Sequence, residues 1–318
     1  MVEVGYALSS EEHGPSELVR YAAAAEQAGF RTAMVSDHFH PWTSRQGQSP
    51  FVWSVLGGIA QATERIRVGT GVTCPTIRTH PAIIAHAAAT AAVMLPGRFF
   101  LGVGSGEALN EHILGDHWPP AEVRIEMLEE AVAVMRLLWQ GGTQTHYGEY
   151  YVVENARLFT LPDEQIPILV SAFGPMALAA ATRMGDGYIG TSPEPDLVQG
   201  FADKAGQDKP RIGQMRVCWA EDEAQARREV FELWPTQGLP GQLSQDLVTV
   251  EHFEQAVSVL SEEQVVGEVP CGPDPERHLD SFRAYADAGY DTVCVQQVGA
   301  DQEGFLRFYE REILPKLA

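Results

Sequence analysis

The sequence is poor in positive charge and in long apolar runs, and each shortage excludes a class of protein. Its 318 residues hold 22 lysines and arginines against 43 aspartates and glutamates, which gives a formal net charge of −21. Nucleic-acid binding depends on basic side chains that neutralise phosphates, so we expect no nucleic-acid partner. No apolar run approaches the roughly 18 residues of a membrane span. No basic segment followed by an apolar one opens the chain, so a cytoplasmic protein with no membrane partner is expected.

Cysteine is scarce as well. Four cysteines are present, and they lie far apart at Cys74, Cys218, Cys271 and Cys294. None has a second cysteine or a histidine at the short spacing of zinc ligands, and no disulfide framework is indicated. We therefore expect reduced thiols and no metal site.

The chain does contain a repeated alternation of short apolar runs with longer amphipathic stretches, which is typical of βα units around a buried parallel sheet. The expected strands cover residues 4–8, 32–36, 66–71, 99–103, 168–171, 187–190, 215–219 and 292–296. Eight strands make a (β/α)8 barrel, and a chain of this length fits one barrel. We predict an α/β fold, a (β/α)8 TIM barrel, with residues 1–318 as a single domain.

Amphipathic helices are expected between the strands. In residues 16–29 the apolar positions share one helix face, and Gly29 stands at the stop position. The other expected helices cover residues 81–95, 123–139, 175–184, 222–234, 275–288 and 302–314. Three segments exceed a minimal barrel and are expected as insertions: residues 40–50, 104–120 and 236–268. Loops that follow barrel strands build the active site in this fold, so we expect the functional residues there.

The segment MVSDHFHPW places Asp37, His38 and Trp42 at and just after the end of the second expected strand. Histidine can take or give a proton near neutral pH, so His38 is a candidate general base. A structural role, as a strand cap or a hydrogen-bonded core histidine, remains the alternative for any single histidine. Glu11, near the end of the first strand, could reach the mouth of the same pocket.

The segment GVGSGEALNE, residues 102–111, follows the fourth expected strand. Its glycines would allow a ligand to approach the backbone, and Glu107 stands where a loop would point it at the barrel axis. The segment lacks the lysine of a phosphate-binding P-loop and does not have the dinucleotide-binding spacing. Together, Glu107 and His38 could form an acid and base pair across one pocket.

Two further segments follow expected strands. GTGVTCPT, residues 69–76, ends the third strand, and a glycine there is usually only a turn. SAFGPMA, residues 171–177, places Gly174 and Pro175 at the start of a helix, where free N–H groups could bind an anion. An ordinary turn explains this segment equally well.

Taken together, five segments resemble one family: VSDHFHPW, GTGVTCPT, LGVGSGEALNE, the hairpin-like residues 147–152 and SAFGPMALAAATRMGDGYIGTS. The chain is similar to the luciferase-like proteins of the bacterial luciferase superfamily, and within them to the glucose-6-phosphate dehydrogenase-like oxidoreductases. These enzymes use coenzyme F420, an 8-hydroxy-5-deazaflavin. The similarity extends over nearly the whole chain and implies a bacterial-luciferase-like barrel.

The resemblance also implies roles for individual residues. His38 matches the residue that acts on the substrate hydroxyl, Glu107 its acid/base partner, and Trp42 a residue that stabilises hydride transfer. Gly71 and Val72 match a cis peptide bond behind the deazaflavin ring. The remaining matches are cofactor contacts: Asp37, Cys74, Gly106, Asn110, Phe173, Gly174, Met176 and Ala177. Cys74 stands where the best-known members have threonine.

Two departures from the family pattern concern the substrate. The sugar-phosphate dehydrogenases carry a lysine at each of two positions where this chain has Glu194 and Gly267. A carboxylate in place of a phosphate-binding cation reverses the sign of the interaction. We therefore expect a dehydrogenase that transfers hydride between a sugar or other secondary alcohol and the deazaflavin, with a small-molecule substrate other than glucose 6-phosphate.

Three alternatives remain open at this stage: a reductase of a carbonyl or activated double bond that uses reduced F420, an FMN-dependent monooxygenase, and a cofactor-binding protein without turnover. FMN is the less favoured cofactor. A homodimer is expected because related proteins commonly pair through helices near the second and third βα units.

Overall fold

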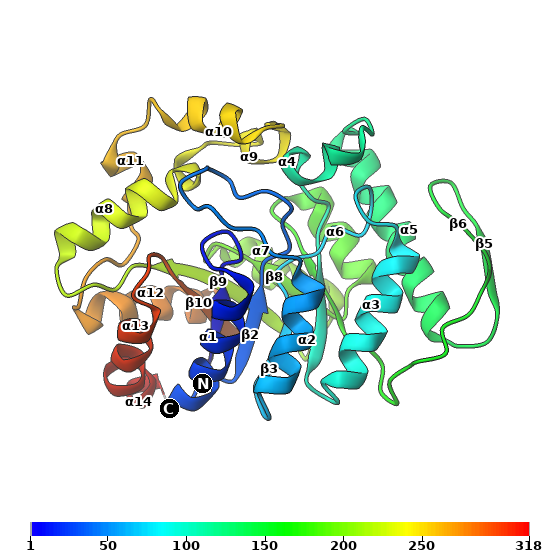
Figure 1. The fold of residues 1–318 in the computed structure, drawn as a ribbon, viewed down its shortest axis with the longest axis horizontal. Helices are drawn as coiled ribbons and strands as arrows, with labels where there is room; N and C mark the ends of the chain where they lie inside the picture. Colours follow the sequence, from blue (N-terminus) through cyan, green and yellow to red (C-terminus); the bar gives the residue numbers. More distant parts are fainter. Residues whose placement is uncertain (1, 318) are drawn as a thin grey trace.

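The computed structural model describes residues 2–317, which form a closed parallel barrel surrounded by helices (Figure 1). The strand order around the barrel is β1-β10-β9-β8-β7-β4-β3-β2. The barrel strands are β1 (Glu3–Leu8), β2 (Thr32–Val35), β3 (Arg67–Thr70), β4 (Phe99–Val103), β7 (Ile168–Ser171), β8 (Gly187–Gly190), β9 (Arg211–Val217) and β10 (Thr292–Gln297). This arrangement confirms the predicted (β/α)8 barrel.

Long helices connect successive barrel strands and cover the outside of the barrel. They are α1 (Pro15–Ala28), α2 (Val52–Ala62), α3 (Pro81–Met94), α5 (Ala121–Trp139), α6 (Pro175–Met184), α7 (Pro195–Ala205), α8 (Glu223–Leu233) and α12 (Pro275–Ala288). After β10 the chain ends in α13 (Gln302–Phe308), a π-helical turn (Tyr309–Ile313) and α14 (Leu314–Leu317). Proline at the first turn and left-handed Gly29 at the end delimit α1, as its sequence predicts.

Two of these helices, α2 and α7, were not predicted from the sequence. Helix α2 contains two adjacent glycines, which are poor helix formers. The structure shows why one is present: a Cβ on Gly58 would lie 2.6 Å from Cγ2 of Val19, so this glycine lets α1 and α2 pack closely. Helix α7 carries Gly200 in its interior and spans only 11 residues, which weakens its helical pattern.

The seventh barrel strand begins earlier than predicted. It was expected at residues 215–219, and the structure places β9 at Arg211–Val217. Gln214 and Arg216 are polar residues within this strand and line the cavity at the end of the barrel. They interrupt the apolar run by which a buried parallel strand is recognised. The predicted strand was therefore placed too far toward the C-terminus.

A two-stranded hairpin, β5 (Gln144–Tyr147) with β6 (Val152–Ala156), lies beside the barrel (Figure 1). The expected insertion at residues 40–50 is an irregular loop. The second contains α4 (Ala108–Glu111) and a 3₁₀ turn (His112–Leu114), and the third holds a 3₁₀ turn (Pro235–Gly238) with α9 (Leu243–Asp246), α10 (Val250–Val257) and α11 (Glu262–Val266). These short helices gather at one end of the barrel (Figure 1).

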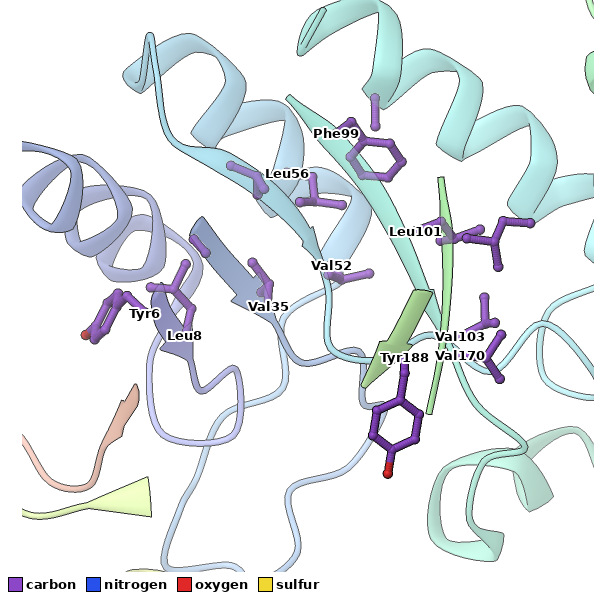
Figure 2. Close-up of a cluster of buried hydrophobic side chains, with 14 of the residues drawn as sticks. Tyr6, Leu8, Val35, Val52, Leu56, Phe99, Leu101, Val103, Val170 and Tyr188 are labelled. Carbon is purple, nitrogen blue, oxygen red and sulfur yellow. The ribbon is translucent and has the colours of Figure 1, made fainter. Parts of the chain in front are cut away.

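The main core lies between the strands and the helices, where apolar side chains from both pack together (Figure 2). A second cluster fills the interior of the barrel: Ala7, Met34, Phe100, Leu169, Ile189, Ile212 and Cys294. Because the interior is filled, a ligand can be held only at an end of the barrel.

All four cysteines are buried and free. Among residues 2–317, no helix is both long and apolar enough to cross a membrane. In the same part of the chain, no group of three His, Cys, Asp or Glu side chains is arranged to hold a metal ion.

Candidate active site

A cavity of about 1360 Å³ opens at the carboxyl ends of the barrel strands. Twelve of the thirteen predicted site residues line it: His38, Glu107, Trp42, Asp37, Gly71, Val72, Cys74, Gly106, Phe173, Gly174, Met176 and Ala177. The thirteenth, Asn110, is buried behind the cavity wall. The fold therefore brings the end of β2, the end of β3, the loop after β4 and the start of α6 to one ligand-sized space.

His38 lies between two carboxylates at the end of β2. Its Nδ1 is 3.1 Å from Oε1 of Glu11, and its Nε2 is 3.5 Å from Oε1 of Glu107. The Trp42 ring packs edge-on against the imidazole, with ring centroids 5.0 Å apart. Each ring nitrogen therefore lies close to a carboxylate, so a positive charge on the imidazole would be stabilised from both sides, although Nδ1 is not aligned for a hydrogen bond with Glu11.

Glu11 is fixed on its other side by two serines. The hydroxyls of Ser9 and Ser36 each donate to Glu11 Oε2 at 2.8 Å, and Glu11 is 2 % exposed. The sequence placed Glu11 near the expected mouth of the pocket but did not distinguish it from the adjacent Glu12, which is the same residue type. Only the structure shows that Glu11 contacts the histidine.

Glu107 is held by Asn110 one helical turn later. Asn110 Nδ2 donates to Glu107 Oε1 at 2.5 Å, while Asn110 Oδ1 accepts hydrogen bonds from the backbone N–H groups of Phe39 and His40. Asn110 thus joins the loop after β4 to the loop that carries His38. Asn110 is therefore placed to hold the His38 loop and Glu107 in a fixed relative position.

A buried ion cluster lies beside Asp37. Arg78 Nη2 is 3.1 Å from Asp37 Oδ1, and its Nε is 3.4 Å from Glu111 Oε1. Thr73 also donates to Asp37 at 2.8 Å. Burial raises the pKa of Glu111 to about 7, and the neighbouring Arg78 opposes that rise. Arg78 could not be recognised from the sequence, because its partners come from the loop after β2 and from α4.

The wall formed by β3 and the loop after β4 has special backbone geometry. The Gly71–Val72 peptide bond is cis, as the resemblance implies. Gly106 has φ +75°, and a Cβ there would lie 2.5 Å from Cys74 Sγ. Burial keeps the pKa of the Cys74 thiol well above its ordinary value, so this side chain is neutral and lies 3.0 Å from the Thr76 hydroxyl.

The start of α6 forms another part of the wall. Gly174 precedes Pro175, and a Cβ at Gly174 would meet no heavy atom within 4 Å. Phe173 and Met176 are 55 % and 47 % exposed. Free N–H groups at a helix start attract anions, so this open wall fits a phosphate group.

The opposite wall contains residues that the sequence analysis did not select. Arg216 of β9 lines the cavity and stacks over the Trp234 ring at 4.1 Å. Of the two departures from the family pattern, Gly267 lines the cavity, whereas Glu194 is exposed at the start of α7.

The chain is similar to known proteins over most of its length. The model of the luciferase-like monooxygenase family matches residues 1–292. The chain belongs to this family. It is 37 % identical to the F420-dependent glucose-6-phosphate dehydrogenase of Microbacterium testaceum, over 98 % of this chain and 96 % of the relative. It is 36 % identical to the Rhodococcus erythropolis protein of the same name, over 99 % of this chain and 98 % of that relative.

Solved structures of other proteins have the same fold as this chain. An F420-dependent secondary alcohol dehydrogenase in complex with an F420-acetone adduct superposes with a TM-score of 0.91 and 27 % identity, covering 100 % of this chain and 99 % of that one. A coenzyme F420-dependent tetrahydromethanopterin reductase from Methanopyrus kandleri has a TM-score of 0.80 at 20 % identity, with 100 % and 99 % coverage. The latter similarity supports the barrel fold alone.

Proposed function

We propose that this chain transfers a hydride between the carbinol carbon of a substrate alcohol and C5 of coenzyme F420. It is an F420-dependent oxidoreductase of the luciferase-like family, as the names of its relatives and of its 27 % identical structural neighbour support. The observation that carries the proposal is His38, whose two ring nitrogens face Glu11 and Glu107 at the wall of a ligand-sized cavity.

The cavity wall suits the cofactor. Gly71, Val72, Cys74 and Gly106 form an uncharged part of the wall, against which the deazaflavin ring would rest. The start of α6, with Phe173, Gly174, Met176 and Ala177, would hold the phosphate-bearing tail through backbone N–H groups. Asp37 also lines the cavity, although Arg78 and Thr73 occupy both of its carboxylate oxygens.

The residues of the chain then manage the proton. When bound, the deazaflavin supplies a carbon that accepts or returns hydride. His38 Nε2 removes the proton of the substrate hydroxyl, and Glu11 compensates the positive charge that develops on the ring. Glu107 provides the second acid/base group on the cofactor side. Trp42 packs against the imidazole and restricts its orientation.

The substrate that we propose is a sugar or other secondary alcohol and not glucose 6-phosphate. Among residues 2–317 no lysine lines the cavity. By the family resemblance, Gly267 stands where the sugar-phosphate enzymes carry one. Glu194, at the second such position, adds negative charge at the start of α7. A phosphate dianion would therefore meet weaker attraction here. The same site can catalyse the reverse reduction, because the direction depends on the relative potentials.

Replacing His38 tests the proposed reaction. We expect His38→Ala to lower turnover of an alcohol by about 10²- to 10⁴-fold, since it removes the general base. Binding of the deazaflavin, followed by its absorbance change, should persist. His252→Ala, at an exposed position on α10, is the matched control. Unchanged turnover of His38→Ala would contradict the assignment, and tight FMN binding without deazaflavin binding would contradict the cofactor.

We also propose a homodimer. Helix α3 exposes Ile83 and Val93, 60 % and 43 % exposed, and Phe51 beside the start of α2 is 60 % exposed. Helices α2 and α3 pack side by side, and exposed apolar side chains that gather on neighbouring elements are characteristic of an interface. Sedimentation velocity should give a dimer for the wild type and a shift towards monomer for Ile83→Glu.

A further inference from the structure

The wall opposite the proposed ring site carries a cation that the reaction described so far does not use. In the strand order β1-β10-β9-β8-β7-β4-β3-β2, strand β9 is four strands from β3 in either direction. Arg216 on β9 therefore faces Gly71 and Val72, at the end of β3, across the mouth of the barrel. A molecule held between them and His38 would occupy the place of the substrate.

Two glutamines fix the guanidinium of Arg216 in position. Its Nη1 donates to Gln237 Oε1 at 2.8 Å, and its Nε donates to Gln296 Oε1 at 3.3 Å. Trp234 supports the flat face of the group. The guanidinium is therefore held in one orientation, and its third nitrogen, Nη2, has no hydrogen-bond acceptor among residues 2–317.

The charge of Arg216 is not cancelled by a partner. In residues 2–317, no carboxylate oxygen lies within 4.0 Å of it. The nearby Glu12 accepts hydrogen bonds from Trp234 Nε1 and from the Gly299 N–H, and burial raises its pKa to about 7. Glu12 therefore carries only part of a negative charge near neutral pH. The other arginine on the cavity wall, Arg124, is already engaged by Pro119, Gln245 and, at 4.0 Å, Asp246.

Hydrogen-bond donors also exceed acceptors beside Arg216. Gln296 is 1 % exposed and lines the cavity, and its Nε2 has no acceptor among the described residues. Its Oε1 already accepts from both Arg216 and Gln214 Nε2, the latter at 3.0 Å. Buried donors without acceptors are costly, so this wall fits a ligand that brings oxygen atoms.

We propose that Arg216 binds a carboxylate of the substrate at the end remote from the reacting carbinol, so that the preferred substrates are secondary alcohols that carry a carboxylate. The proposal rests on the hydride transfer proposed at His38. A carboxylate fits better than a phosphate because one guanidinium balances one negative charge, and exposed acidic residues, Glu268 and Asp280, lie at the cavity rim.

The test compares secondary alcohols that bear a terminal carboxylate with the corresponding primary amides, over a series of chain lengths. With F420 bound, the wild type should oxidise the carboxylate of the fitting length about 10- to 100-fold more efficiently in kcat/KM than its amide. Arg216→Gln should abolish this preference, because kcat/KM for the carboxylate should fall to the value that the same variant shows for the amide. Arg228→Gln, exposed on α8, is the control and should retain the preference.

Three results would overturn the proposal: no carboxylate preference in the wild type, an unchanged preference in Arg216→Gln, or a stronger preference for the matched phosphate ester. Far-UV circular dichroism and F420 affinity check that the variant folds. Arg216→Lys provides a second variant, and it should keep the charge but lose part of the preference because it lacks the guanidinium fork.

A binding measurement separates this proposal from the reaction. Titration calorimetry of the F420-loaded protein with the matching keto acid needs no turnover. Tighter binding to the wild type than to Arg216→Gln supports the carboxylate site even if no alcohol is oxidised, a result that would contradict only the proposed hydride transfer. Equal binding overturns the carboxylate site and leaves the hydride transfer standing.

Discussion

The contact between Glu11 and His38, which only the structure reveals, predicts that the negative charge of Glu11 contributes to catalysis. Glu11→Gln keeps the size of the side chain and removes its charge. The carboxylate lies 3.1 Å from His38 Nδ1, and two serine hydroxyls at 2.8 Å hold it in place. We expect the variant to fold and to bind F420, and to catalyse more slowly.

The size of the effect follows from the charge that develops on the imidazole. When His38 takes the hydroxyl proton it becomes a cation, and a charge-assisted contact of this kind contributes about 1.5–3 kcal/mol. At about 1.4 kcal/mol per factor of ten, losing the charge should lower kcat about 10- to 100-fold. The affinity for the cofactor should change little, because Glu11 does not lie on the wall proposed to hold it.

The assay is steady-state reduction of F420 by an alcohol, followed by the loss of its visible absorbance. Ser9→Ala is the matched control, because it removes one hydrogen bond to Glu11 and leaves the charge; a loss below about fivefold is expected. If Glu11→Gln retains kcat within threefold of the wild type while His38→Ala is inactive, the reasoning about Glu11 is refuted.

Three other variants test the surroundings of the site. Gly106→Ala should weaken F420 binding at least tenfold in a fluorescence titration, because the new Cβ would lie 2.5 Å from Cys74 Sγ at a φ of +75°; unchanged affinity would contradict this. Arg78→Leu should lower the free energy of unfolding in urea at pH 8 by about 3–5 kcal/mol, because two carboxylates stay buried without their cation; a loss below 1 kcal/mol would count against it. Burial raises the pKa of Glu12 from 4.5 to about 7, so its contribution to stability is complete below pH 4.5 and is lost as the pH rises through 7; Glu12→Gln should flatten the urea stability profile by about 3 kcal/mol between pH 4.5 and 8, and parallel profiles would contradict this.

The regular part of the fold could be predicted from the sequence because a buried parallel strand leaves a strong pattern. Strand β4 is a nearly continuous apolar run, and helix α12 begins and ends at the predicted residues. The prediction failed where function or close packing replaces the expected residue type. Polar Gln214 and Arg216 displaced β9, and glycines hid α2 and α7.

The candidate site could be predicted only in part for a related reason. Residues directly after a strand, such as His38 and Glu107, are marked by their position. Residues that act through a partner carry no such mark. Nothing in the local sequence distinguishes Arg78 from other arginines, because its two carboxylate partners are distant along the chain. Arg216 lies inside strand β9 and not directly after a strand, so its position does not mark it either. Long-range side-chain pairing cannot be derived from local pattern.

The central claim is that this cavity holds F420 beside an alcohol and transfers a hydride between them. The most direct measurement uses a secondary alcohol that carries deuterium on the carbinol carbon, incubated with the protein and oxidised F420. The account predicts that the cofactor loses its visible absorbance and that deuterium appears at its C5. Reduced cofactor without deuterium at C5, or F420 that does not bind at all, would contradict it.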